Sequence, residues 1–161
     1  MSTIWKDNKK GISIIEILIV IAIIATAFFS LFSLVVFSLR ISNLIKETSQ
    51  ANSLAEETIE AVRNFRDGSD WHTDGLGTLT VGDSYYPQKS GDNPAKWQIV
   101  AGEETIDGFT RKVVFDQVQR DDNHNIVETG AIVDLNAKKV TAIVSWKDKE
   151  IEIVTYLTNW R

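Results

Sequence analysis

The stretch "KKGISIIEILIVIAIIATAFFSLFSLVVFSL", residues 9–39, decides what kind of chain this is. After Gly11 the residues are almost all apolar, and Ile17–Leu39 contains no charged residue. A helix of about 20 apolar residues crosses the hydrocarbon core of a bilayer, so this segment is long enough to span a membrane. One acid, Glu16, lies inside its first part, where a charge is costly. Glu16 is therefore either a functional group or a residue at the membrane edge, close to the preceding lysines.

The composition of the chain divides it into two parts. It has 161 residues, 43% of them hydrophobic, and a formal net charge of -5. Residues 40–161 have the composition of an ordinary acidic soluble domain and are long enough to bury a core. Because 22 acids outnumber 17 bases, no direct contact with nucleic acid is predicted. The chain has no cysteine, which leaves out a disulfide framework and a thiolate metal site.

The residues before the apolar run are short and basic, with Lys6, Lys9 and Lys10 against Asp7. The positive-inside rule therefore predicts a cytoplasmic N-terminus and an exported domain after the apolar run. A secretory signal peptide cut after Ala27 is one alternative, although the apolar run continues well beyond that point. A plain single-pass anchor is another, and it leaves the glycine and the acid of the opening stretch without a role.

The first residues of this segment, "KKGISIIEILIVIAIIA", resemble the leader of type IV pilins and type II secretion pseudopilins. The resemblance implies that residues 1–11 are a leader and that prepilin peptidase cuts between Gly11 and Ile12. It also implies N-methylation of Ile12 and an assembly role for Glu16, the fifth residue of the mature chain. Residues 12–39 would then form the transmembrane helix, which later packs in the core of a filament.

The expected chemistry of the cut agrees with this resemblance. Cleavage leaves an α-ammonium group on Ile12, and Glu16 lies one helical turn away, on the same face. A desolvated cation with one good partner position can set the register of subunits, and in the family the pairing is thought to join neighbouring subunits. The chain departs from many pilins by having no proline before Pro87 and no cysteine pair. These departures favour a minor pilin or a pseudopilin.

The resemblance further implies the partners and the location of the protein. The partners would be other pilin or pseudopilin subunits, prepilin peptidase and the membrane protein of the assembly platform. The chain would begin in the inner membrane and end in an extracellular or periplasmic filament, and it would have no cofactor and no enzymatic activity. A pilus, a type II secretion system and a DNA-uptake filament all remain open. The alternative is a membrane-anchored binding domain that does not polymerise.

The pattern after the apolar run predicts the rest of the fold. Residues 40–66 continue the helix, with a stripe that recurs every three or four positions and is suited to a core. The members of the stripe are Ile41, Ile45, Thr48, Ala51, Ala55, Ile59, Val62 and Phe65. Residues 67–96 form a loop-rich connector, and residues 97–161 alternate as strands do. The prediction is an α+β, pilin-like fold, in which one long helix packs on a four- to five-stranded antiparallel sheet.

Turns and loops complete the prediction. Residues 121–125 and 147–149 join strands, and Gly82-Asp83 is the turn of a small hairpin. The helix hydroxyls at Thr26, Ser30 and Ser33 are expected to bond back to backbone carbonyls, which would soften the helix. The connector aromatics either make an adhesive surface or pack the connector onto the core; they are Trp71, Tyr85, Tyr86 and Trp97.

One loop has part of a calcium-binding pattern. Asp121, Asn123 and Asn125 alternate as calcium ligands would, but Ile126 and Ile132 occupy the positions where an EF-hand has Gly and Glu. A polar hairpin turn is the alternative. The histidines, at positions 72 and 124, lie in polar loops without a pattern for metal or acid–base chemistry. No nucleophile, zinc or phosphate motif is present in the sequence.

Overall fold

The computed structural model describes residue 11, residues 13–129 and residues 132–160. The chain is α+β: one long helix at its N-terminal end is followed by a seven-stranded antiparallel sheet, the pilin-like arrangement expected from the sequence. It divides into two compact units, one ending at Lys46 and the other beginning at Glu47. The second unit, called the domain unit below, contains the sheet and the end of the helix.

The helix, α1, runs from Ile14 to Gly68 without interruption. No proline occurs within it, so nothing in the sequence removes a backbone donor from its interior. Its first turn carries Glu16 and its last turn carries Arg66, which places each charge at the end of the helix dipole that favours it. The helix ends two residues later than the sequence predicted, within the usual uncertainty of a helix end.

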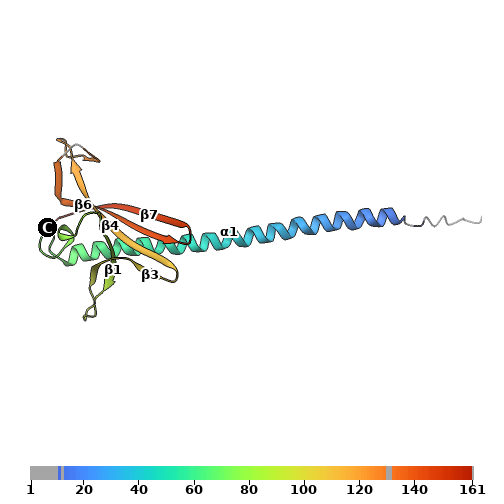
Figure 1. Cartoon of the computed structure of the whole chain (residues 1–161), viewed down its shortest axis with the longest axis horizontal. Coiled ribbons are helices and arrows are strands. Elements are labelled where there is room, and N and C mark those ends of the chain that lie inside the picture. The colour runs from blue at the N-terminus through green and yellow to red at the C-terminus, as the bar shows by residue number, and fades with distance from the viewer. Residues whose placement is uncertain (1–10, 12, 130–131, 161) are drawn as a thin grey trace, which may run out of the picture. The chain divides into compact units, whose positions relative to one another are not determined.

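The sheet has five strands in its main path and two short strands beside it. The main path is β2-β1-β4-β6-β7, while β3 and β5 each pair with β4. The two short strands explain why the count exceeds the expected four to five. Figure 1 shows the strands, which are β1 Ser84–Lys89, β2 Trp97–Ala101, β3 Glu104–Ile106, β4 Phe109–Arg120, β5 Ile126–Val127, β6 Ile132–Trp146 and β7 Lys149–Thr158.

The hairpin predicted around Gly82-Asp83 is wrong. Residues 79–81 form no strand, and β1 pairs with β2 and β4 instead. The backbone of this segment is bound elsewhere: the Gly82 N–H donates to the Phe115 carbonyl at 3.0 Å, and the Thr80 N–H donates to the Tyr85 hydroxyl at 3.0 Å. Gly82 has φ +82, a conformation that glycine adopts without strain.

Near the C-terminal end, two connections between strands agree with the prediction, whereas the division of residues 125–146 into strands differs from it. Residues 121–125 join β4 to β5, and a turn at Lys147 and Asp148 joins β6 to β7, as expected. However, residues 125–135 are not one strand, because only Ile126 and Val127 form β5. Residues 132–146 then form the single strand β6, which merges two strands that the sequence separated.

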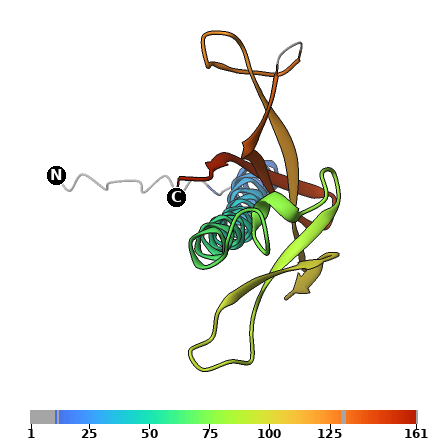
Figure 2. The ribbon, with the colours of Figure 1, turned by 90° about the vertical axis from the view of Figure 1, so that its left-hand side faces the viewer.

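The pairing of β4 with β6 contains an irregularity. Gln117 pairs with Lys138, but the next residue, Val118, pairs with Asp134, so residues 135–137 have no partner on β4. Beyond this point β4, β5 and the start of β6 form an arm. Figure 2 shows this arm and the β1–β2 hairpin projecting from opposite sides of the domain unit.

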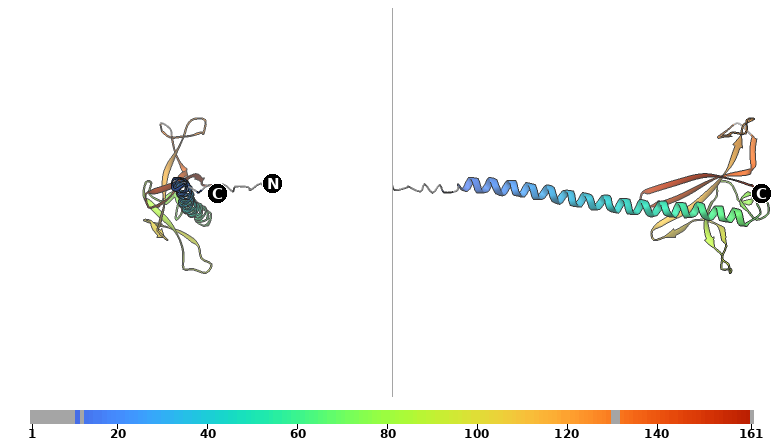
Figure 3. Two further views of the ribbon diagram at one scale, coloured as in Figure 1. Left: turned by 90° about the vertical axis from the view of Figure 1, so that its right-hand side faces the viewer. Right: turned by 180° about the vertical axis from the view of Figure 1, so that it is seen from behind.

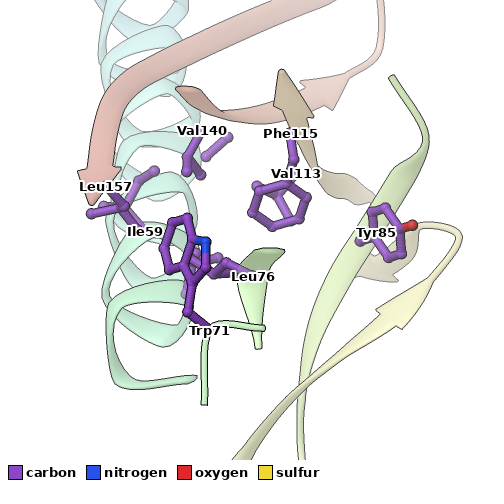
Figure 4. Close-up of a cluster of buried hydrophobic side chains, with 10 residues drawn as sticks. Ile59, Trp71, Leu76, Tyr85, Val113, Phe115, Val140 and Leu157 are labelled. Atoms are coloured by element: carbon purple, nitrogen blue, oxygen red, sulfur yellow. The ribbon is translucent and has the colours of Figure 1, made fainter. Parts of the chain in front are cut away.

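The core of the domain unit lies between the end of α1 and one face of the sheet. Figure 3 shows the end of the helix running along the strands. Ala51 and Ala55 are fully buried beside Phe109 and Trp146. A second cluster surrounds Phe115 (Figure 4), and its other buried members are Ile59, Val62, Trp71, Leu76, Tyr85, Val113, Val140, Ala142 and Leu157. Of the predicted stripe, Ile41 and Ile45 are therefore exposed and Thr48 and Phe65 half-buried, while the buried members are Ala51, Ala55, Ile59 and Val62.

A buried arginine connects the helix, β3 and β4. Arg111 is 5% exposed, and its Nη2 lies 2.6 Å from Glu104 Oε2. Its Nη1 lies 3.4 Å from Glu57 Oε1 on α1, within ion-pair distance but without hydrogen-bond geometry, and that N–H has no other partner among the described residues. The charge is thus compensated by two carboxylates, which a buried cation requires.

Candidate functional site

The candidate functional site is the first part of α1, in the unit that ends at Lys46. Every described residue of this part is exposed, and Phe29 reaches 80%. The helix is long and apolar enough to cross a membrane. In water, an apolar surface of this size would be unfavourable, so a lipid phase or other protein chains must cover it.

Glu16 lies in the first turn of this helix. Its backbone N–H donates to the Ser13 carbonyl at 3.0 Å. The first N–H groups of a helix have no partner in the preceding turn, and they carry a partial positive charge that favours a nearby carboxylate. The helix start therefore suits an acid at this position, although the predicted partner, the amine of Ile12, lies outside the described residues.

Gly11 is exposed, and the described residues around it do not require a glycine. A β-carbon added to Gly11 would meet no described atom within 4 Å, and its φ is outside the range that favours glycine. An alanine would fit the described surroundings. The predicted cut after Gly11 would give the glycine a use that its described surroundings do not. The cut and the methylation of Ile12 stay predictions.

The hydroxyl groups of the apolar run bond to the helix backbone, as the sequence predicted. Thr26 Oγ1 donates to the Ile23 carbonyl at 2.9 Å, and Ser30 Oγ donates to the Thr26 carbonyl at 2.9 Å. Ser33 Oγ donates to the Phe29 carbonyl at 3.0 Å. Each bond replaces a contact that the hydroxyl would otherwise make outside the helix.

The structure explains the incomplete calcium pattern as a turn between β4 and β5. Asp121 Oδ1 accepts the N–H groups of Asn123 at 3.0 Å and Asn125 at 2.7 Å, and Asp121 Oδ2 accepts the Asn125 amide at 3.1 Å. The Asn125 side chain, followed by its backbone, lowers the pKa of Asp121. In the described ranges, no group of three or more acidic or histidine side chains is placed to hold a metal ion.

Two of the four aromatic residues of the connector are buried. Trp71 and Tyr85 belong to the core, where the Trp71 Nε1 donates to the Leu135 carbonyl at 3.0 Å. Tyr86 and Trp97 are half-buried. These aromatics therefore hold the connector on the domain, and the adhesive alternative finds no support at Trp71 and Tyr85. The histidines lie apart, with His72 after α1 and His124 in the turn before β5.

Sequence reasoning missed an ion-pair cluster at the point where α1 enters the domain unit. Glu47 is not a member of the predicted apolar stripe, yet its Oε1 lies 2.6 Å from Lys147 Nζ in the β6–β7 turn. Glu47 Oε2 accepts the Trp146 Nε1 hydrogen at 3.3 Å. The hydrogen bond from Lys147 is the main reason that the pKa of Glu47 is lowered. No local signal reveals this pairing, because its members are a hundred residues apart.

A buried lysine was also missed. Lys138 is 8% exposed, and its Nζ lies 3.4 Å from the Leu79 carbonyl. Burial lowers its pKa, since the charged form is disfavoured away from water, and the negative charge of Asp116 opposes the shift. Strand alternation could not reveal it, because its neighbour Ala137 is buried too, next to the irregularity in β6.

Comparison with protein-family models, with curated proteins and with solved structures found no match to this chain.

Proposed function

We propose that this protein is a filament subunit of the pilin or pseudopilin type, assembled through its N-terminal helix. It enters the inner membrane with its N-terminus in the cytoplasm. Prepilin peptidase cuts after Gly11, Ile12 is methylated, and the subunit moves from the membrane into a fibre. The absence of a cysteine pair favours a minor subunit.

One observation carries the proposal: a glycine that the described residues around it do not require precedes an acid in the first turn of a helix whose first part is apolar and fully exposed. A simple membrane anchor needs neither residue. Both have a use if a peptidase must recognise the chain and if Glu16 must pair with a new amine. The helix-on-sheet architecture of the domain unit supports the same class of protein, because a filament subunit needs a folded part that stays outside the fibre core.

The test is the mass of the mature N-terminus after coexpression with a prepilin peptidase. A chain that begins with N-methylated Ile12 supports the proposal. An intact Met1 would favour the membrane-anchored binding domain, and a chain that begins at Phe28 would favour secretion. Gly11→Val should block the cut, whereas Gly68→Val, at another glycine with open space around it, should not.

A second measurement tests the assembly role of the acid. Glu16→Val should leave membrane insertion and cleavage intact, because it makes the apolar run more uniform. Incorporation into the filament should fall, because the amine of the incoming subunit loses its partner. The measurement is the amount of variant in sheared filaments relative to the amount in the membrane. Normal incorporation of the variant would refute the register role.

A further inference from the structure

An open cavity of about 590 Å³ lies in the domain unit where α1 and β7 end. One wall comes from the last turn of α1 and the segment after it, with Arg66 and residues 68–72. The other comes from the end of β7 and the two residues that follow it, residues 158–160. Its volume is in the range of ordinary ligand sites. Nothing in the predicted assembly mechanism uses it.

The first wall is held in place by its own hydrogen bonds. Asp70 Oδ1 accepts the N–H groups of His72 at 3.0 Å and Thr73 at 3.1 Å. These bonds lower the pKa of Asp70, the one from the His72 backbone most, so its carboxylate stays charged. The Gly77 N–H donates to the Trp71 carbonyl at 3.0 Å, and a β-carbon at Gly77 would collide with that oxygen. The wall is therefore formed before any ligand arrives.

The second wall presents a tryptophan to solvent. Trp160 is 63% exposed, and its Nε1 donates to Asp67 Oδ1 at 3.3 Å. The same oxygen accepts the Arg66 Nε hydrogen at 2.9 Å, and the Asn159 N–H donates to the Asn136 carbonyl at 2.8 Å. The indole is thus oriented by hydrogen bonds while much of its surface stays open to water. Tryptophan is mostly buried in proteins, which makes such an exposed ring a candidate contact surface.

The charges around the cavity indicate what kind of ligand fits. Arg66 and Asp70 line it, and both already have partners: Arg66 Nε donates to Asp67 Oδ1, and Asp70 accepts the N–H groups of His72 and Thr73. The remaining polar groups are hydroxyl and amide groups such as those of Thr158 and Asn159. A charged ligand would have to compete with these partners for Arg66 or Asp70. A cation would also meet the Arg66 guanidinium, which weakens any cation–π attraction to the indole.

We propose that this cavity binds a neutral carbohydrate. The apolar C–H face of one sugar ring lies on the Trp160 indole, because slightly positive C–H groups are attracted to the negative face of the ring. The sugar hydroxyls exchange hydrogen bonds with Asn159, Thr158 and Arg66, which replace their bonds to water. Because the wall is already formed, binding costs little ordering of the protein.

In the test, the full chain is dissolved in a detergent without a sugar headgroup. It is then applied to an array of neutral, sialylated and sulfated glycans. We expect neutral glycans to be retained. The retained glycan is then titrated while the Trp160 Nε1–H signal is followed by NMR, and this signal should shift. Retention of charged glycans alone, or of none, would overturn the proposal.

Variants separate the ring from its surroundings. Trp160→Ala should weaken binding about tenfold or more, the factor that corresponds to losing ~1.4 kcal/mol. Trp160→Phe keeps an aromatic face and should retain most of the affinity. Tyr156→Ala, at an exposed aromatic residue within β7, is the control and should bind as the unmodified chain does. Equal binding by Trp160→Ala would also overturn the proposal. Because no peptidase or filament is involved, this result is independent of the proposed assembly role.

Discussion

Within one continuous helix, residues 14–46 and residues 47–68 meet different surroundings. The first part is exposed throughout, whereas the second buries a stripe that includes Ala51, Ala55, Ile59 and Val62. The second part alternates between apolar and polar faces, and its apolar face finds the sheet. The first part is apolar on all sides from Ile17 to Leu39 and finds no cover within the described chain. The amphipathic part of the helix therefore folds with the domain, whereas the uniformly apolar part is suited to lipid or to contact with other chains.

Side-chain size differs between the two parts as well. Where the helix meets the cluster of Phe109 and Trp146, the buried helix residues are Ala51 and Ala55, which let the backbone approach these two rings. The first part carries large exposed rings such as Phe28 and Phe29 instead. Close approach to a fixed sheet requires small residues, whereas lipid adapts to large ones.

The sharpest test of this comparison is to remove one phenylalanine from each region. Phe115→Ala leaves a cavity at a fully buried site and should lower the free energy of unfolding by ~3–5 kcal/mol. Phe29→Ala, at a residue 80% exposed, should leave the unfolding of the domain unchanged. The measurement is urea denaturation of the full chain in detergent, followed by near-UV circular dichroism. Equal destabilisation by both changes would contradict the division.

A charge placed in each region of the helix gives the next largest effect. Ile24→Lys puts a cation in the middle of the apolar run and should cost ~2.5–3.5 kcal/mol of membrane insertion. The chain should therefore leave the membrane fraction after cell fractionation. Asn64→Lys, on the exposed face of the second part, is the matched control and should fractionate normally. If both variants stay in the membrane, the first part is not the membrane segment.

Enlarging an alanine in each region tests the role of side-chain size. Ala55→Leu overfills the cluster around Phe109 and Trp146 and should destabilise the domain by ~1–3 kcal/mol. Ala22→Leu, at an exposed position of the first part, should not change domain stability. Thermal unfolding of both variants, monitored by tryptophan fluorescence, compares them directly. A stable Ala55→Leu variant would show that the helix can move away from the sheet.

The smallest effect concerns the acid at the start of the domain unit, and it depends on pH. Because pairing lowers the pKa of Glu47 below its ordinary value of 4.5, the pairing adds stability above about pH 4.5. That contribution is lost as the pH falls through the lowered pKa. The melting temperature of Glu47→Gln should thus be slightly below that of the unmodified chain at pH 7. This difference in melting temperature should disappear in acid.

Glu60→Gln serves as the control for the acid variant. Glu60 pairs only with Arg63 on the same helix among the described residues, and exposed pairs of this kind contribute little. Its melting temperature should follow that of the unmodified chain at every pH. If the melting temperature of Glu47→Gln stays below that of the unmodified chain even below pH 3, the effect of the substitution is not ionic.

The sequence predicted the parts of the fold that follow local periodicity. Residues 97–161 alternate as strands do, and in β4 the alternate residues Phe109, Val113 and Phe115 are buried on one face. Arg111 lies on the same face and is buried too. The sequence alone suggests that an arginine is exposed, because it does not reveal the carboxylates that pair with it. One of them, Glu57, lies on the helix, far away along the chain. Long-range pairs of this kind cannot be derived from spacing.

Local patterns also failed in two characteristic ways. Ile41 and Ile45 continue the helical stripe, yet they are exposed, because a stripe does not show where its covering sheet ends. At the irregularity in β6, Ala137 and Lys138 are both buried, which no period of two predicts. In contrast, the candidate site was visible from the sequence: Gly11, Glu16 and the uncharged run are neighbours along the chain, so no tertiary information was needed.

The hydroxyl groups of the apolar run have a consequence for movement between phases. Thr26, Ser30 and Ser33 each carry an acceptor for their proton within the same helix. A hydroxyl that bonded to water or to a neighbouring chain would have to break that bond on leaving its surroundings. These three hydroxyls keep their hydrogen bonds in any surroundings, because the acceptors belong to the same helix. At these positions, exchange between a lipid phase and a packed protein bundle becomes a question of shape alone.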